Sequence, residues 1–160
     1  MAYALKSISF IMSESQMMQK LNDGIRIPPP NYFDQFPVEK RARAAELWSQ
    51  ELVPEILGRF PEMKEILAGV LADVLTTDEL RRLAEVGDQP GAVRLQTKQP
   101  LTDQDVQDFG RLGLVALAKR LEETKETMNE LMRVRSERWA ISIVGDLMRR
   151  KPDLFSGIYR

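Results

Sequence analysis

Apolar residues recur every three or four positions through most of this chain, which is the spacing of helices with one buried face. Pro54 falls inside the first clear stripe, so we expect that helix to kink or restart there. Pro61 opens a second helix with a wider stripe, which places it at the centre of the core. The two stripes are Val38, Ala42, Ala45, Trp48, Leu52 and Ile56, and then Ile66, Leu67, Val70, Leu71 and Val74.

Two helix starts of the same design follow. Thr76 and Thr102 each stand three residues before an acid, Glu79 and Asp105, which is the spacing of a capping box. Leu75 with Leu80, and Leu101 with Val106, stand at hydrophobic-staple positions. Gly87-Asp88 is expected to end the first helix, Gln89-Pro90-Gly91 to start a short one, and Gln99-Pro100 to end that one.

The longest periodic segment has the spacing of a coiled-coil seam. It runs through Leu117, Leu121, Thr124, Met128 and Leu131, and Val134, Ile141 and Met148 are expected to continue it on a shifted face. Gly110 and Gly113 are expected to admit a close helix neighbour. One unbroken helix over 103–150 would run about 70 Å, against a radius of gyration of about 15 Å for a compact chain of this length. We therefore expect a bend near Arg133–Arg138, or a projecting end that meets a partner.

The two ends of the chain differ from its middle. Residues 1–26 form an N-terminal helical segment that is rich in methionine, and 27–36 form an extended spacer, because Pro28, Pro29 and Pro30 exclude helix. Aromatic residues of the spacer are expected to anchor it on a helical core at 37–150. Lys151-Pro152 should end the last helix and leave 151–160 as a non-helical tail. The predicted fold is all-α, a single helical domain of five to seven helices with a long C-terminal helix.

Composition narrows the chemistry. The 160 residues carry a net charge of −1 and contain neither histidine nor cysteine, which removes thiol and imidazole catalysis and the usual zinc and haem ligands. We predict no cofactor, no metal and no enzyme activity. The longest apolar run, Ile66–Ala72, is too short to span a bilayer, although peripheral membrane association stays open. The N-terminus lacks the pattern of an intact signal peptide, although Ala2-Tyr3-Ala4 has the form of a cleavage site.

Two sets of charged residues, the acidic pairs and a basic region, are candidates for a functional role. Asp78/Glu79 and Asp103/Asp105 are acidic pairs, but first-turn acids are favoured by capping and by the helix dipole, so we assign them to structure. The basic region from Arg133 to Lys151 is interrupted by acids and lacks a recognition motif, which disfavours nucleic acid as a partner.

The segment Leu75-Thr-Thr-Asp-Glu-Leu-Arg-Arg-Leu83, followed by Gln89-Pro90-Gly91 and Gln99-Pro100, resembles the bacterial family called domain of unknown function 2059. The resemblance covers about residues 66–121. The chain departs from the family at Val86-Gly87, where an aromatic pair is common. The resemblance implies a small all-helical protein exported to the periplasm, with no catalytic residues to transfer. A cytoplasmic location is the alternative.

The leading hypothesis is a non-enzymatic interaction or assembly protein of a bacterial cell envelope, which binds a protein partner through its N-terminal segment, the Arg133–Met148 helix or the C-terminal tail. The alternative is a carrier of a small molecule or lipid, with an apolar pocket between helices. The residues predicted to contact the partner are Met12, Met17, Met18, Arg135, Arg138, Trp139, Phe155 and Tyr159.

Overall fold

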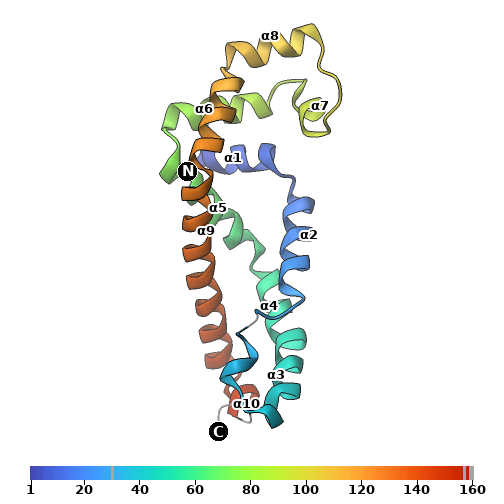
Figure 1. The fold of residues 1–160 in the computed structure, drawn as a ribbon, viewed down its shortest axis with the longest axis vertical. Helices are drawn as coiled ribbons and strands as arrows, with labels where there is room; N and C mark the ends of the chain where they lie inside the picture. The colour runs from blue at the N-terminus through green and yellow to red at the C-terminus, as the bar shows by residue number, and fades with distance from the viewer. Residues whose placement is uncertain (30, 157, 159–160) are drawn as a thin grey trace. The chain divides into compact units, whose positions relative to one another are not determined.

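The computed structural model describes residues 1–29, 31–156 and 158, and every regular element in this part of the chain is helical (Figure 1). The predicted all-α fold with a long C-terminal helix is confirmed. The chain divides into more helical segments than the five to seven expected, because turns interrupt several of the predicted helices. The segments form two compact units. Unit 1 comprises Met1–Glu14 and Pro61–Arg135, and unit 2 comprises Ser15–Phe60 and Ser136–Arg160.

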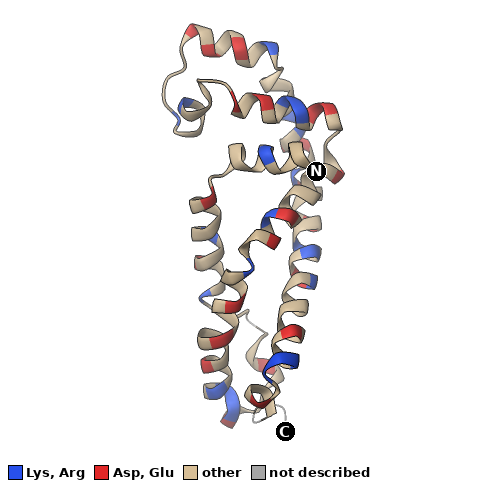
Figure 2. Cartoon of the chain, turned by 180° about the vertical axis from the view of Figure 1, so that it is seen from behind, with Lys and Arg blue, Asp and Glu red and all other residues tan. Residues whose placement is uncertain are grey.

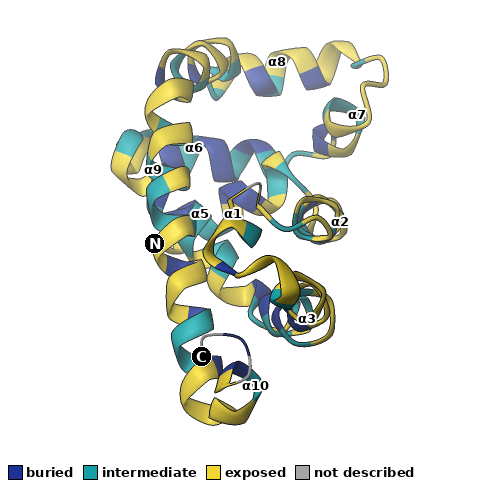
Figure 3. Ribbon diagram, turned by 60° about the horizontal axis from the view of Figure 1, so that its bottom comes forward, coloured by how far each residue is buried: buried dark blue, intermediate teal, exposed yellow. Residues whose placement is uncertain are grey.

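Unit 1 contains α1 (Ala2–Ile11), α5 (Phe60–Val74), α6 (Thr77–Gly87), α7 (Ala92–Gln96), α8 (Asp103–Arg111) and the first part of α9 (Leu114–Arg150). Helix α1 packs along α6 through small residues, with Ala4 and Ser7 fully buried (Figures 1 and 3). The Ser7 hydroxyl donates to the Leu80 carbonyl oxygen at 3.2 Å. The first helix is therefore an integral part of unit 1.

Both capping boxes are confirmed. The Thr76 amide donates to Glu79 Oε2 at 2.7 Å, and the Glu79 amide donates back to Thr76 Oγ1 at 3.2 Å. Thr102 and Asp105 repeat this exchange at the start of α8. The second staple is wrong, because Val106 is 58% exposed while α8 buries Phe109. By contrast, both residues of the first staple, Leu75 and Leu80, are buried.

The break in the long C-terminal segment lies at Gly113, which has a φ of +70° and separates α8 from α9. Helix α9 then continues through Arg133–Arg138 with no turn that interrupts it, and its 37 residues correspond to about 55 Å of helix. The glycines do not admit a close helix neighbour. A Cβ at Gly110 would meet nothing within 4 Å, and one at Gly113 would meet only the Arg82 side chain. Gly113, in the left-handed region, separates α8 from α9.

Unit 2 contains most of α2 (Glu14–Ile25), the short 3₁₀ turns η1 (Phe33–Gln35) and η2 (Val38–Lys40), α3 (Arg41–Leu47), the π-helical turn η3 (Trp48–Leu52), α4 (Val53–Gly58), the end of α9 and α10 (Pro152–Ser156). The predicted apolar stripe is partly wrong here, because Val38 is 75% exposed and Ala42 and Ala45 are exposed. The buried positions are instead Ala44, Leu47, Leu52 and Ile56. The step of five residues from Leu47 to Leu52 spans the π turn, which holds one more residue than a turn of α-helix.

The C-terminal tail was predicted to be non-helical, and this is wrong for Pro152–Ser156, which form α10. Proline is well suited to the first turn of a helix, so Pro152 ends α9 and begins α10. Phe155 and Ile158 are buried in the core of unit 2. Pro30 and Tyr159 lie outside the described residues. None of the described helices combines the length and the apolar character that crossing a membrane requires.

Candidate functional site

An aromatic cluster fixes the segment after the prolines onto unit 2, as predicted. The Tyr32 ring meets Phe33, Phe36 and Trp48 edge-on, with ring centroids 4.9–5.2 Å apart. Tyr32 Oη donates to the Ala44 carbonyl oxygen at 3.0 Å, and Trp48 Nε1 donates to the Ile25 carbonyl oxygen at 2.8 Å. Both polar groups are thereby satisfied by backbone, while the rings supply apolar surface.

The π turn η3 presents Trp48 and Leu52 beside this cluster. The Val53 amide donates to the Trp48 carbonyl oxygen, five residues back. Pro54 follows and has no amide hydrogen, and in a regular α-helix its ring would clash with the carbonyl group of Gln50. The wider turn accommodates the proline. Such π turns occur frequently at functional sites.

The end of α9 forms the facing wall. Its buried side carries Trp139, Ile143 and Leu147 at steps of four, whereas Ile141 is 67% exposed and Met148 is 36% exposed. The expectation that Ile141 and Met148 continue the buried seam is therefore wrong. The four-residue step rotates the buried face away from them, because 3.6 residues make one turn.

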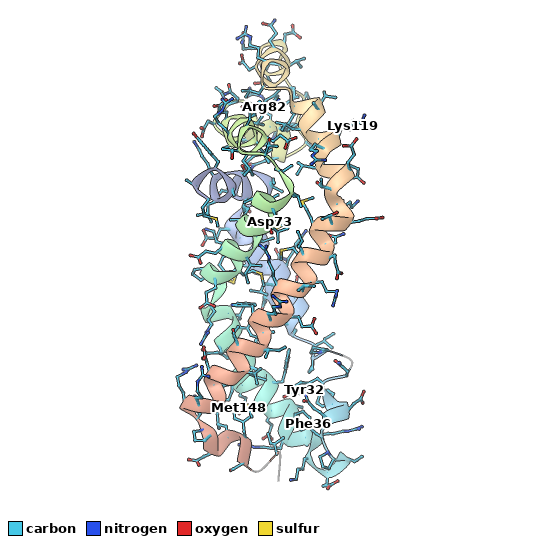
Figure 4. The ribbon with its side chains drawn as sticks, turned by 90° about the vertical axis from the view of Figure 1, so that its left-hand side faces the viewer. Tyr32, Phe36, Asp73, Arg82, Lys119 and Met148 are labelled. Carbon is cyan, nitrogen blue, oxygen red and sulfur yellow. The ribbon has the colours of Figure 1, made fainter. Side chains whose placement is uncertain are left out.

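Between these walls lies an apolar groove of about 390 Å³, which we call the unit 2 groove. Its α9 wall consists of Ala140, Ile141, Val144, Gly145 and Met148. Its other wall consists of Leu47, Trp48 and Leu52, with Tyr32, Gln35 and Phe155 completing the lining. Figure 4 labels Met148 on α9 and Tyr32 and Phe36 on the segment that follows the prolines. The volume lies within the range of small-molecule sites.

Gly145 gives the groove an open floor. A Cβ added there would meet nothing within 4 Å. A glycine inside a helix costs about 1 kcal/mol relative to alanine, and no neighbour in unit 2 requires this one. The missing side chain leaves backbone exposed to whatever occupies the groove.

A row of ion pairs joins the end of α9 to η3 and α4. Lys151 lies 2.8 Å from Glu51, Arg150 lies 2.6 Å from Glu55, and Arg59 lies 2.8 Å from Asp146. The hydrogen bond from Arg150, followed by that from Arg59, holds the pKa of Glu55 below its usual value. The hydrogen bond from Arg59 does the same for the pKa of Asp146. Glu55 and Asp146 therefore act as structural ion-pair partners between the end of α9 and the α4 segment.

Asp78, Glu79 and Asp105, from the acidic pairs of unit 1, make structural contacts as well. Glu79 and Asp105 complete the capping boxes, and Asp78 pairs with Arg81 at 2.6 Å. Asp105 also receives two hydrogen bonds from Arg94, at 2.6 and 2.7 Å. Within the described part of the chain, no group of three or more acids is placed to hold a metal ion.

The residues predicted to contact a partner do not form one patch. Met12 and Arg135 belong to unit 1, where Met12 is half-buried and Arg135 pairs with Asp73 on α5. The others that the structure describes belong to unit 2. There, Met17 and Trp139 are buried, Met18 is half-buried, Arg138 is exposed, and Phe155 lines the groove. Tyr159 lies outside the described residues.

Sequence reasoning missed Tyr32, Trp48, Ile141, Gly145 and Met148 as a candidate site. One signal was available, because Ile141 and Met148 are large apolar residues that lie off the seam of α9. The other wall depends on the π turn, where Pro54 predicts an irregularity in the helix but not its π form.

Comparison with known proteins adds no assignment: no family model matches the chain, and neither does any curated protein or any solved structure. The resemblance to the domain of unknown function 2059 family therefore stays a prediction.

Proposed function

We propose that this protein is a non-enzymatic interaction protein, and that the unit 2 groove binds an apolar segment of a protein partner. The observation that carries the proposal is the exposure of Ile141 and Met148 beside the rings of Tyr32 and Trp48. Large apolar side chains gathered along a groove are typical of protein interaction sites. The partner site lies on unit 2 in this proposal, because α1 is already occupied by α6.

The polar groups of the groove support binding rather than catalysis. The Tyr32 hydroxyl and the Trp48 indole N–H are bonded to backbone, and Gln35 is the other side chain with a polar group in the lining. General acid–base and nucleophilic catalysis need a titratable or nucleophilic group held in reach of a substrate. The carboxylates near the end of α9 are engaged in ion pairs instead.

The cellular setting that we propose is the bacterial envelope, and it follows from the resemblance to the domain of unknown function 2059 family. A periplasmic protein would be released with the periplasmic fraction when the outer membrane is opened. Recovery with the cytoplasmic fraction would favour the alternative location and would leave the groove proposal untouched.

A carrier of a small apolar molecule is the second candidate, and the groove volume of about 390 Å³ favours it. Native mass spectrometry of the purified protein would reveal a bound molecule of low mass. The Gly145→Trp variant fills the groove floor, so it should lose that molecule. A mass equal to that of the chain alone would argue against the carrier.

The test of partner binding compares two exposed apolar residues on the same helix. Ile141 lies in the groove, and Val115, which is 85% exposed, lies in unit 1. The full chain would be used to capture proteins from the cells that make it, as wild type, Ile141→Asp and Val115→Asp. We expect one protein to be captured by the wild type and by Val115→Asp but not by Ile141→Asp. Equal capture by all three would contradict the proposal.

A further inference from the structure

We infer that the occupant of the unit 2 groove is an amphipathic helix that carries an acidic residue beyond each end of its apolar stripe. This inference rests on the proposed function and specifies the chemistry of the partner. Three observations support it: the arginines on either side of the apolar wall of α9, the exposure of that wall, and the glycine in the groove floor.

Two arginines bracket the apolar wall of α9. Arg138 lies one turn before Ile141 and Arg149 one turn after Gly145, so both share the edge of the groove face. Eleven residues of helix separate them by about 16 Å along the axis. Along the groove edge of α9, a positive charge, an apolar stretch and a second positive charge thus follow one another over about three turns. Figure 2 shows basic and acidic residues interspersed along the rest of this helix.

Both arginines are available to a ligand. Arg138 is exposed and makes no ion pair within the described part of the chain. Arg149 pairs with Asp146 on its own helix, but its side chain is 77% exposed. An exposed pair of this kind contributes little to stability, so exchanging it for a partner's carboxylate costs little. An occupant with acids at this spacing would gain two ion pairs on docking.

The shape of the groove favours a helix over an acyl chain. A site for a small apolar molecule buries most of its ligand, whereas here Ile141 stands 67% exposed on the wall. Such an open strip matches the apolar face of a helix, which needs cover on one side only. The open space above Gly145 lets the backbone of that helix approach closely. A fatty acid would also use one arginine at most, since it has one charged end.

A second copy of this chain is disfavoured as the occupant. Two α9 helices meeting antiparallel through this face would bring Arg138 close to Arg149 of the other copy. A parallel arrangement would align like residues. Like charges placed opposite each other across an interface disfavour association. The charge pattern therefore selects a different, acidic segment.

The test uses three synthetic helical peptides of identical length and leucine pattern. One carries two glutamates about eleven residues apart, the second carries glutamine at both positions, and the third carries lysine. Their affinity for the full chain would be measured by fluorescence anisotropy at about 0.02 M and about 0.5 M salt. The protein variants are Ile141→Asp, the double variant Arg138→Gln/Arg149→Gln, and Val115→Asp as the matched control.

We expect the glutamate peptide to bind roughly three- to thirty-fold tighter than the glutamine peptide at low salt, and the lysine peptide to bind most weakly. High salt and the double arginine variant should each remove most of this difference while sparing the glutamine peptide. Ile141→Asp should abolish the binding of all peptides, and Val115→Asp should change nothing.

The two proposals fail in different ways. Equal affinity for the glutamate and glutamine peptides, both lost in Ile141→Asp, would overturn the acidic partner and keep the groove as a binding site. An acid preference that survives Arg138→Gln/Arg149→Gln would also overturn it. Binding that survives Ile141→Asp would count against the groove itself.

Discussion

Asp105 uses one carboxylate for two structural contacts. It accepts from the Thr102 amide at 2.8 Å, which caps α8, and it receives the guanidinium of Arg94 from the end of α7. Its side chain is buried, and the hydrogen bond from Arg94 is the main reason why the pKa of Asp105 lies well below its usual value. The turn between α7 and α8 is therefore closed by a single residue.

This pKa shift predicts how stability depends on pH. A carboxyl group whose pKa is lowered by folding stabilises the fold above its unfolded pKa of about 4, and this contribution is lost as the pH falls through the folded pKa. Asp105→Asn should therefore destabilise the protein most near neutral pH, and its difference from the wild type should shrink below about pH 4. Urea unfolding across this range measures it. The Asp103→Asn variant, which replaces an exposed acid of the same helix, serves as the control. A difference in the free energy of unfolding between Asp105→Asn and the wild type that does not change with pH would refute the argument.

Gly91 exists to make room for that carboxylate. A Cβ at Gly91 would lie 2.5 Å from Asp105 Cγ, so the Gly91→Ala variant must move Asp105 away from Arg94. We expect a loss of about 1–3 kcal/mol in the free energy of unfolding, as for other overpacked sites. Gly110→Ala in α8 meets nothing within 4 Å and should stabilise by up to about 1 kcal/mol. Equal effects of the two substitutions in urea unfolding would contradict this.

At the level of the helices, the end of α9 has one face buried in the core of unit 2 and another face that is exposed. Ile143 is fully buried, and Ile141, half a turn away, is 67% exposed. The two positions hold the same residue type in the same helix. They therefore form a matched pair that distinguishes a structural role from a binding role.

Ile143→Asp should unfold unit 2, since burying an unpaired carboxylate costs about 4 kcal/mol or more. Ile141→Asp should change the free energy of unfolding by no more than about 0.5 kcal/mol and should abolish partner binding. Circular dichroism during urea unfolding compares the two directly. A large loss of stability in Ile141→Asp would show that this side chain supports the fold instead.

The π turn makes a prediction of its own at this scale. Deleting Gln50 would reduce the five-residue step from Leu47 to Leu52 to four, which suits a regular α-helix, but Pro54 would then clash with a carbonyl group. We expect the deletion combined with Pro54→Ala to be about 3 kcal/mol more stable than the deletion alone. Pro54→Ala in the intact chain should have an effect below about 1 kcal/mol. Equal effects in both backgrounds, measured by urea unfolding, would mean that the proline and the π turn are unrelated.

For the whole molecule, local signals in the sequence predicted local structure well. The capping boxes at Thr76 and Thr102, the stop at Gly87-Asp88 and the helix start at Pro61 depend on neighbours within a turn or two, so the sequence alone reveals them. The anchoring of the spacer through Tyr32 was also predictable, because clustered aromatic rings have few other ways to be buried.

Features that depend on distant contacts were not predictable in this way. The buried positions around Trp48 differ from the predicted stripe because the π turn adds one residue to the helical turn. Helix α10 is stabilised by burial of Phe155 in the core of unit 2. The groove is built from segments that lie between Tyr32 and Phe155. The sequence pointed separately to Phe155 and to the off-seam residues Ile141 and Met148, but not to their meeting in one groove. The division into two units, each built from separated stretches of chain, likewise depends on long-range packing.

Site-specific photo-crosslinking in the cells that make this protein reports whether the unit 2 groove holds a protein partner. A photoreactive phenylalanine analogue would replace Ile141 in one strain and Val115 in another, since both positions are exposed on α9. We predict one discrete protein adduct from position 141 and none from position 115. The same adducts from both positions, or none from position 141 while the protein is present and folded, would show that the groove does not hold a protein partner.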